Sequence, residues 1–260
     1  MDETRLGEIE AWFDAYCRSF AGDDEEARRN YDLKEQHTGK VRENIRLLAE
    51  LVGMAGSGLA TAEAVGILHD VGRFEQYRRY RTFLDRESVN HAALGVEVIR
   101  EHRVLAGLPD TEAESVVRAV RFHNVFMVPP TIRGEERRYL DLIRDADKLD
   151  IWRVFMEYFD LPEGERASAA GLGFADDPSC TPAVLACLER REMVNLTLLK
   201  TLNDFKLLQL SWVFDLNCPE SFRLARQQGH LSRLAASLPA GAGVERALQT
   251  VWDFLADRLR

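Results

Sequence analysis

The sequence is poor in strand signals, in cysteine and in long apolar runs. It has no sustained apolar–polar alternation between Asn-Gly or Asp-Gly turns, which argues against a β-sandwich or a barrel. Its four cysteines form no C-x-x-C pair, a pattern typical of reduced thiols and not of a zinc ribbon or a disulfide scaffold. Residues 1–10 are polar and acidic, unlike a signal peptide, and the most apolar window, 47–68, contains two glutamates and four glycines. We therefore expect a cytoplasmic protein that does not enter a membrane.

The charge is unbalanced towards acid, with 34 Lys and Arg residues against 43 Asp and Glu residues and a net charge of −9. A protein that binds phosphate backbones without sequence preference needs a basic surface, so bulk nucleic acid is not an expected partner. Hydrophobic residues make up 46% of the chain and charged residues 30%, as in an ordinary globular protein. A chain of 260 residues is long enough for one large domain, or for a core with an extension.

Apolar residues recur at helical spacing along almost the whole chain, which predicts an all-α fold. A stretch rich in Gly, Ala, Pro and Asp at 160–182 predicts a long loop, and further helices are expected from about 182 to 260. We expect Gly72 to end the third helix as a C-cap, and Thr111 with Glu114 to start the fifth as a capping box. The helices expected before the loop cover about 4–20, 31–52, 60–71, a segment from 88 or 90, 111–123 and 136–159.

Several histidines and aspartates lie on the apolar faces of these helices. His37 begins one apolar stripe, His123 ends another, and the adjacent pair His69 and Asp70 ends a third. Asp147 lies one turn from an isoleucine on either side, and a buried carboxylate costs several kcal/mol unless it is paired or bound to a metal. A single inward histidine is more often a hydrogen-bonded core residue. Several imidazoles and two carboxylates on consecutive helices instead favour a shared metal ion.

The order His37, then His69-Asp70, then Asp147 resembles the H…HD…D pattern of the HD superfamily of metal-dependent phosphohydrolases. The resemblance covers about residues 31–155 and implies an HD-domain helical bundle with additional C-terminal helices. We expect a single domain over 1–260, with a metal-binding core at about 31–158 and a helical extension at about 182–260. The segments that carry the resemblance are HTGKVRENI (37–45), ILHDVGRFEQ (67–76), IRDADKLDI (143–151) and, less specifically, LSWVFDLN (210–217).

The resemblance also implies a ligand set. By that similarity, one metal would be held by His37, His69, Asp70 and Asp147, and a second by Asp70, His91 and His123. The alternative is a single ion, with His91 starting a helix and His123 ending one for structural reasons alone. His102 and His230 have no motif around them, and we interpret both as structural.

Mixed imidazole and carboxylate ligands suit Mn, Fe, Zn, Co or Ni better than Ca or Mg alone. The sequence has neither a G-x-S-x-G nor a Walker motif, so we expect no serine nucleophile or P-loop. A bound divalent ion would instead activate hydroxide. The expected catalytic residues are Asp70, Arg73 and Lys148. Arg73 begins an arginine-rich stretch whose members either contact phosphate or form a solvated loop. Lys148 is expected to contact either the substrate or an acidic residue at the surface.

By resemblance, the function is hydrolysis of a phosphomonoester or a phosphodiester, with a nucleotide-like small molecule as the substrate. Two alternatives remain open at this point. Some proteins of the HD superfamily with the same dinuclear ligand set are di-iron oxygenases, and others retain the fold as a non-catalytic ligand-sensing module. A complete ligand set argues against the second alternative. The sequence leaves a homo-oligomer open.

Overall fold

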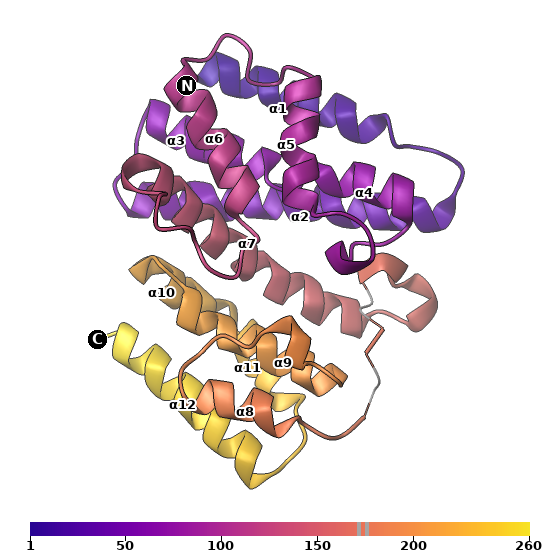
Figure 1. The fold of residues 1–260 in the computed structure, drawn as a ribbon, viewed down its shortest axis with the longest axis vertical. Coiled ribbons are helices and arrows are strands. Elements are labelled where there is room, and N and C mark those ends of the chain that lie inside the picture. The colour runs from indigo at the N-terminus through magenta and orange to yellow at the C-terminus, as the bar shows by residue number, and fades with distance from the viewer. Residues whose placement is uncertain (171–172, 175–176) are drawn as a thin grey trace. The chain divides into compact units, whose positions relative to one another are not determined.

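The computed structural model describes residues 1–170, 173–174 and 177–260. In that part of the chain the only regular secondary structure is helical (Figure 1), which confirms the all-α class. None of the helices described is long and apolar enough to cross a membrane. Contacts divide the chain into an N-terminal unit, residues 1–151 with 161–172, and a C-terminal unit, residues 152–160 with 173–260. The expectation of one domain over 1–260 stays a prediction.

The N-terminal unit is a bundle whose innermost helix is α3. Every residue of α3 from Ala60 to Leu68 is buried, and the helix packs against α1, α2 and α6. The sequence explains this position, because a helix that is predominantly apolar around its circumference is stable only inside a protein. Its two buried polar residues, Thr61 and Glu63, bond to Glu112 of α6 and Arg42 of α2. The α-helices of the unit are α1 (Glu3–Arg18), α2 (Glu25–Leu51), α3 (Ser57–Leu68), α4 (Gly72–Tyr80), α5 (His91–Glu101), α6 (Asp110–Phe122) and α7 (Gly134–Asp160) up to Ile151.

Side-chain caps set the starts of three of these helices. Asp2, Asp24 and Asn90 each accept a backbone N–H from the first turn of α1, α2 and α5, which satisfies a donor that has no partner within the helix. The cap at Asp24 starts α2 six residues before the expected position at 31. The cap at Asn90 confirms one of the two expected starts of the fourth helix.

Two expected caps are wrong. Gly72 is not a C-cap, because α3 ends at Leu68 and Gly72 is the first residue of the next helix, α4. A β-carbon at Gly72 would lie 2.2 Å from the carbonyl oxygen of His91, so glycine is required here by the close approach of α4 and α5. Thr111 does not start α6 either, because Pro109 is the N-cap and no side chain caps this helix.

The C-terminal unit is helical, as expected beyond about residue 182. A capping box starts α9, where Thr201 and Asp204 accept from each other's backbone N–H. Trp152, in the last part of α7, donates its indole N–H to the carbonyl of Gln209 at 3.1 Å. The α-helices of this unit are α8 (Pro182–Glu189), α9 (Leu202–Ser211), α10 (Pro219–Gln228), α11 (His230–Ala236), α12 (Ala242–Arg258) and the end of α7. The expected loop at 160–182 includes short 3₁₀ turns at Glu163–Glu165 and Ser168–Ala170, and its residues 171–172 and 175–176 lie outside the described part of the chain.

Candidate metal centre

The expected ligands come from five helices of the N-terminal unit, and most of them lie where a helix begins or ends. His37 lies in the middle of α2. His69 is the C-cap of α3 with Asp70 directly after it, and His123 is the C-cap of α6. His91 is the first residue of α5. All five side chains are buried, so a cluster expected from the sequence exists as a group of neighbours.

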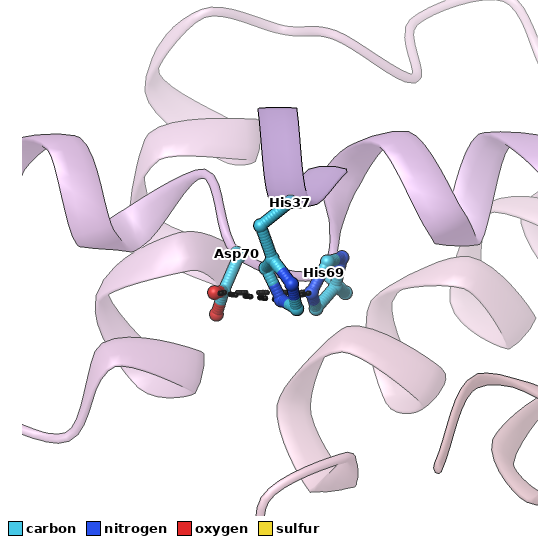
Figure 2. A group of neighbouring side chains, drawn as sticks. All are labelled: His37, His69 and Asp70. Carbon is cyan, nitrogen blue, oxygen red and sulfur yellow. Dashed lines mark hydrogen bonds and ion pairs between the residues drawn. The ribbon is translucent and has the colours of Figure 1, made fainter. Parts of the chain in front are cut away.

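The first group consists of His37, His69 and Asp70, whose donor atoms lie within 4.8 Å of one another (Figure 2). Oδ2 of Asp70 is 3.7 Å from Nε2 of His37 and 3.8 Å from Nε2 of His69. Asp147 approaches the same two nitrogens from α7, with Oδ1 at 3.1 Å and 3.8 Å. The two carboxylates and two imidazoles that were expected to share one ion therefore point at a common centre.

The second group consists of Asp70, His91 and His123, again with donor atoms within 4.8 Å of one another. It uses the other oxygen of Asp70, because Oδ1 is 3.4 Å from Nε2 of His91 and 3.7 Å from Nε2 of His123. The Nε2 atoms of His91 and His123 are 3.1 Å apart. One carboxylate thus separates two pairs of histidines, with one oxygen facing each pair.

Backbone carbonyls orient one histidine of each pair. Nδ1 of His69 donates to the carbonyl of Gly66, and Nδ1 of His123 donates to the carbonyl of Val120, both at 2.8 Å. A carbonyl only accepts hydrogen bonds, so Nδ1 carries the proton and Nε2 of the neutral ring is left unprotonated. Each of these bonds joins a C-cap residue to a carbonyl at the end of its own helix, where carbonyls have no partner within the helix.

Carboxylates orient the other histidine of each pair. Asp150 is 2.7 Å from Nδ1 of His37, and Asp85 is 2.8 Å from Nδ1 of His91. Such carboxylate–histidine pairs are the usual outer contacts of metal-binding imidazoles, because they fix the ring and make it a stronger base. Asp85 and Asp150 were both missed in the sequence. The spacing of Asp150, one turn after Asp147 on α7, is a signal that could have identified it.

Residues 35–152 match the family model described as HD domain. The chain contains an HD domain. The matched range includes all six residues expected to be ligands and the two carboxylates that orient His37 and His91. No curated protein and no solved structure matches the chain.

Burial controls the protonation of the second histidine pair in this HD domain. It lowers the pKa of both rings to about 4, with added repulsion from Arg73 on His91 and from His69 on His123. Both rings are therefore neutral near pH 7, and their unprotonated Nε2 atoms face each other at 3.1 Å with no proton to share. Two lone pairs at this distance repel, and a cation between them removes the repulsion.

The first group has different electrostatics. Burial and the nearby Lys34 oppose protonation of His37, but hydrogen bonds to Asp147 and Asp150 raise its pKa above the ordinary value. Burial lowers the pKa of His69. Despite its own burial, Asp70 has a pKa well below the usual range, because Lys34 and other positive groups stabilise the carboxylate. Asp70 is therefore an anion that requires positive charge around it.

The donor set fits divalent transition-metal ions. Neutral imidazole nitrogens and ionised carboxylates are the groups that such ions bind, and here their orientations are fixed by further hydrogen bonds. The coarse prediction of a divalent-metal site is consistent with the HD domain and with both groups. The assignment of each residue as a ligand stays a prediction.

Arg73 lies on the first turn of α4, which begins at Gly72, so it does not belong to the solvated loop that was one of the two expectations for it. Its Nη1 donates to Gln76 at 2.7 Å, to the carbonyl of Phe83 at 2.5 Å and to Asp85 at 3.0 Å. Its Nε is buried without a hydrogen bond, 3.6 Å from Oδ1 of Asp70. The guanidinium is fixed beside the second group, and Nη2 takes no part in these bonds.

The remaining expected residues lie outside the two groups. Lys148 is buried, and its ammonium donates to the carbonyl of Arg144 at 3.3 Å. His102 is exposed and packs against Trp12, with ring centroids 5.6 Å apart. His230 is the first residue of α11 in the C-terminal unit. Neither of these histidines joins a metal-binding group among the described residues.

Proposed function

We propose that this chain is a metal-dependent phosphohydrolase that cleaves a phosphomonoester or a phosphodiester of a small, nucleotide-like molecule. The observation that carries the proposal is the position of Asp70, one buried carboxylate with an oxygen facing each of two histidine pairs. Two metal ions that share one carboxylate form the arrangement used for hydrolysis of phosphate esters in two-metal sites. The nucleotide-like substrate follows from the resemblance to the HD superfamily alone.

The residues of the two groups would hold the ions, with Asp147 completing the first. When bound, the ions supply Lewis-acid chemistry, because they lower the pKa of water and neutralise charge on the ester. The orienting bonds keep the Nε2 atoms in place before an ion arrives, so little ordering is left for the binding step. Burial excludes bulk water from these donors, which strengthens every charge interaction in the site.

Arg73 binds the phosphoryl group in this proposal. Three hydrogen bonds from Nη1 fix the guanidinium, which leaves Nη2 to donate to a phosphoryl oxygen. A fixed guanidinium loses little conformational entropy when it binds an anion. Lys148 is the second cation assigned to the substrate, and its ammonium, which has three donors, also donates to the carbonyl of Arg144.

The test begins with metal analysis of protein purified without added metal, followed by a panel of phosphatase and phosphodiesterase substrates. Replacement of Asp70 by alanine should remove both ions and the activity while the helical circular dichroism is retained, because Asp70 faces both groups. His102→Ala, which changes an exposed ring outside the groups, is the matched control. A folded Asp70→Ala protein with full metal occupancy would show that the assignment is wrong.

The same experiment tests the oxygenase alternative. A pair of sites built from histidine and carboxylate also suits iron. Iron as the co-purified metal, consumption of O₂ and a mixed-valent EPR signal, without hydrolysis of any ester in the panel, would favour a di-iron oxygenase. Absence of both activities in metal-loaded protein would favour a ligand-sensing module.

A further inference from the structure

Lys34 is a cation in the candidate metal centre that belongs to neither group of ligands. It lies on α2 one turn before His37, so both side chains are on the same face of the helix. Its Nζ is 2.8 Å from Oδ2 of Asp70. Lys34 has 16% of its side chain exposed and Asp70 has 5%, so the pair is shielded from water and is not an ordinary surface ion pair.

The oxygen that Lys34 contacts is the one that faces the first histidine pair. Oδ2 of Asp70 lies 3.7 Å from Nε2 of His37 and 3.8 Å from Nε2 of His69. An ion bound by this group would share Oδ2 with the ammonium of Lys34. Two positive charges on one oxygen repel strongly where little water separates them, so metal binding and the Lys34–Asp70 ion pair compete.

Among the described residues, Asp70 is the only carboxylate that forms an ion pair with Lys34. Its other close contact is with the ring of Phe83, whose centroid is 5.2 Å from Nζ. The guanidinium of Arg73 lies over the same ring at 5.8 Å. A lysine displaced from Asp70 would therefore remain beside Arg73, and the two cations together attract an anion.

We propose that Lys34 is the residue that makes metal binding and anion binding depend on each other. Without metal, its ammonium occupies Asp70 in place of an ion. With metal bound, the ammonium is released to the anionic group of the substrate, next to Arg73. Substrate and metal then strengthen each other's binding, because the anion stabilises the displaced position of Lys34. This inference rests on the proposed function.

The test is Lys34→Met, which keeps most of the apolar stem and removes the charge. A unit charge within about 4–6 Å changes the affinity of a buried group for a proton by roughly tenfold or more, and we expect a change of at least that size for Mn²⁺. In calorimetry without anions, Lys34→Met should bind Mn²⁺ more tightly than the wild type. The Mn²⁺-loaded variant should bind inorganic phosphate more weakly, and phosphate should raise its affinity for Mn²⁺ less than in the wild type.

Lys40→Met is the matched control. Lys40 is on the same helix and pairs with Glu43 at 2.8 Å, but both side chains are more than half exposed, so Mn²⁺ and phosphate binding should not change. Lys34→Arg keeps the charge and should stay close to the wild type. Circular dichroism of each variant confirms folding.

Two results would overturn the inference. Weaker Mn²⁺ binding by folded Lys34→Met would mean that Lys34 supports Asp70 as a ligand and does not compete with the ion. Unchanged phosphate binding would mean that the released ammonium does not contact the anion. Failure of the proposed function has a different signature, because wild-type protein that binds no Mn²⁺, or hydrolyses no ester when loaded, contradicts the function before Lys34 is changed.

Discussion

The first turns of α4 and α5 are in contact at Gly72, and this contact places His91 in the second group. A β-carbon added at Gly72 would lie 2.2 Å from the carbonyl oxygen of His91 and 2.5 Å from the backbone nitrogen of Gly95. Both neighbours are backbone atoms, so no change of rotamer can relieve the clash. Gly72→Ala must therefore separate the starts of α4 and α5, and we expect this to displace His91 relative to Asp70.

The size of the effect follows from these distances. An ordinary van der Waals contact of a β-carbon is 3.4–4 Å long, so the two helices must separate by roughly 1 Å. Overpacking of this kind costs about 1–3 kcal/mol. In a protein of this size each kcal/mol lowers Tm by about 2–4 °C, and we expect Tm of the metal-free protein to fall by about 2–12 °C.

Two measurements test this reasoning. Thermal unfolding by circular dichroism gives the loss of stability, and calorimetric titration with Mn²⁺ should show the stoichiometry falling from two ions towards one. Gly39→Ala is the matched control, because Gly39 lies within α2 two residues from His37 and a β-carbon there meets nothing within 4 Å. That change should stabilise the helix by about 0.5–1 kcal/mol. Unchanged Tm and stoichiometry in Gly72→Ala would refute the proposed role of the contact.

Two further predictions concern Arg73 and pH. Arg73→Ala should leave the metals bound and lower kcat/KM by about ten- to a hundredfold. Arg73→Lys should recover only part of this loss, because lysine keeps the charge without the fork of donors. Near wild-type kinetics in both variants would exclude a contact between Arg73 and phosphate. The pKa values of His91 and His123 are lowered from 6.5 to about 4 in the folded protein, so the unfolded chain takes up their protons first as pH falls. Tm of the metal-free protein should therefore fall as the pH is lowered from 6.5 to 4. A double variant with asparagine at both positions should lose much of this dependence of Tm on pH. A wild-type Tm that stays constant or rises as the pH is lowered would contradict the prediction.

The all-α class and the inward position of the candidate ligands could be predicted because both depend on helical periodicity. An apolar stripe identifies the buried face of a helix, and His37, His123 and Asp147 were placed on such faces. All three side chains point to the candidate centre in the structure. Periodicity works here because burial of a helix face is decided within a few turns of the chain.

Contacts that depend on tertiary structure could not be predicted in this way. Asp85 orients His91 from the 3₁₀ turn before α5, and no local pattern distinguishes it from the other acids of that arginine-rich stretch. The expected C-cap at Gly72 was wrong because a glycine can either end a helix or allow two helices to approach closely. Only the position of α5 shows that Gly72 has the second role. Lys34 was missed for the same reason, since its partner Asp70 is 36 residues away in the chain.

The two ways of orienting the histidines differ in how amino-acid substitutions can affect the candidate centre. The acceptors of His69 and His123 are main-chain carbonyls, which every amino acid possesses, so no side-chain replacement at those acceptor positions can delete them. The acceptors of His37 and His91 are side chains, and one nucleotide change can replace either aspartate with asparagine. Each pair thus combines one candidate ligand whose acceptor belongs to the main chain with one whose acceptor is a replaceable side chain. Under the proposed function, replacements at Asp85 and Asp150 can therefore adjust metal affinity while the main-chain acceptors of His69 and His123 stay in place.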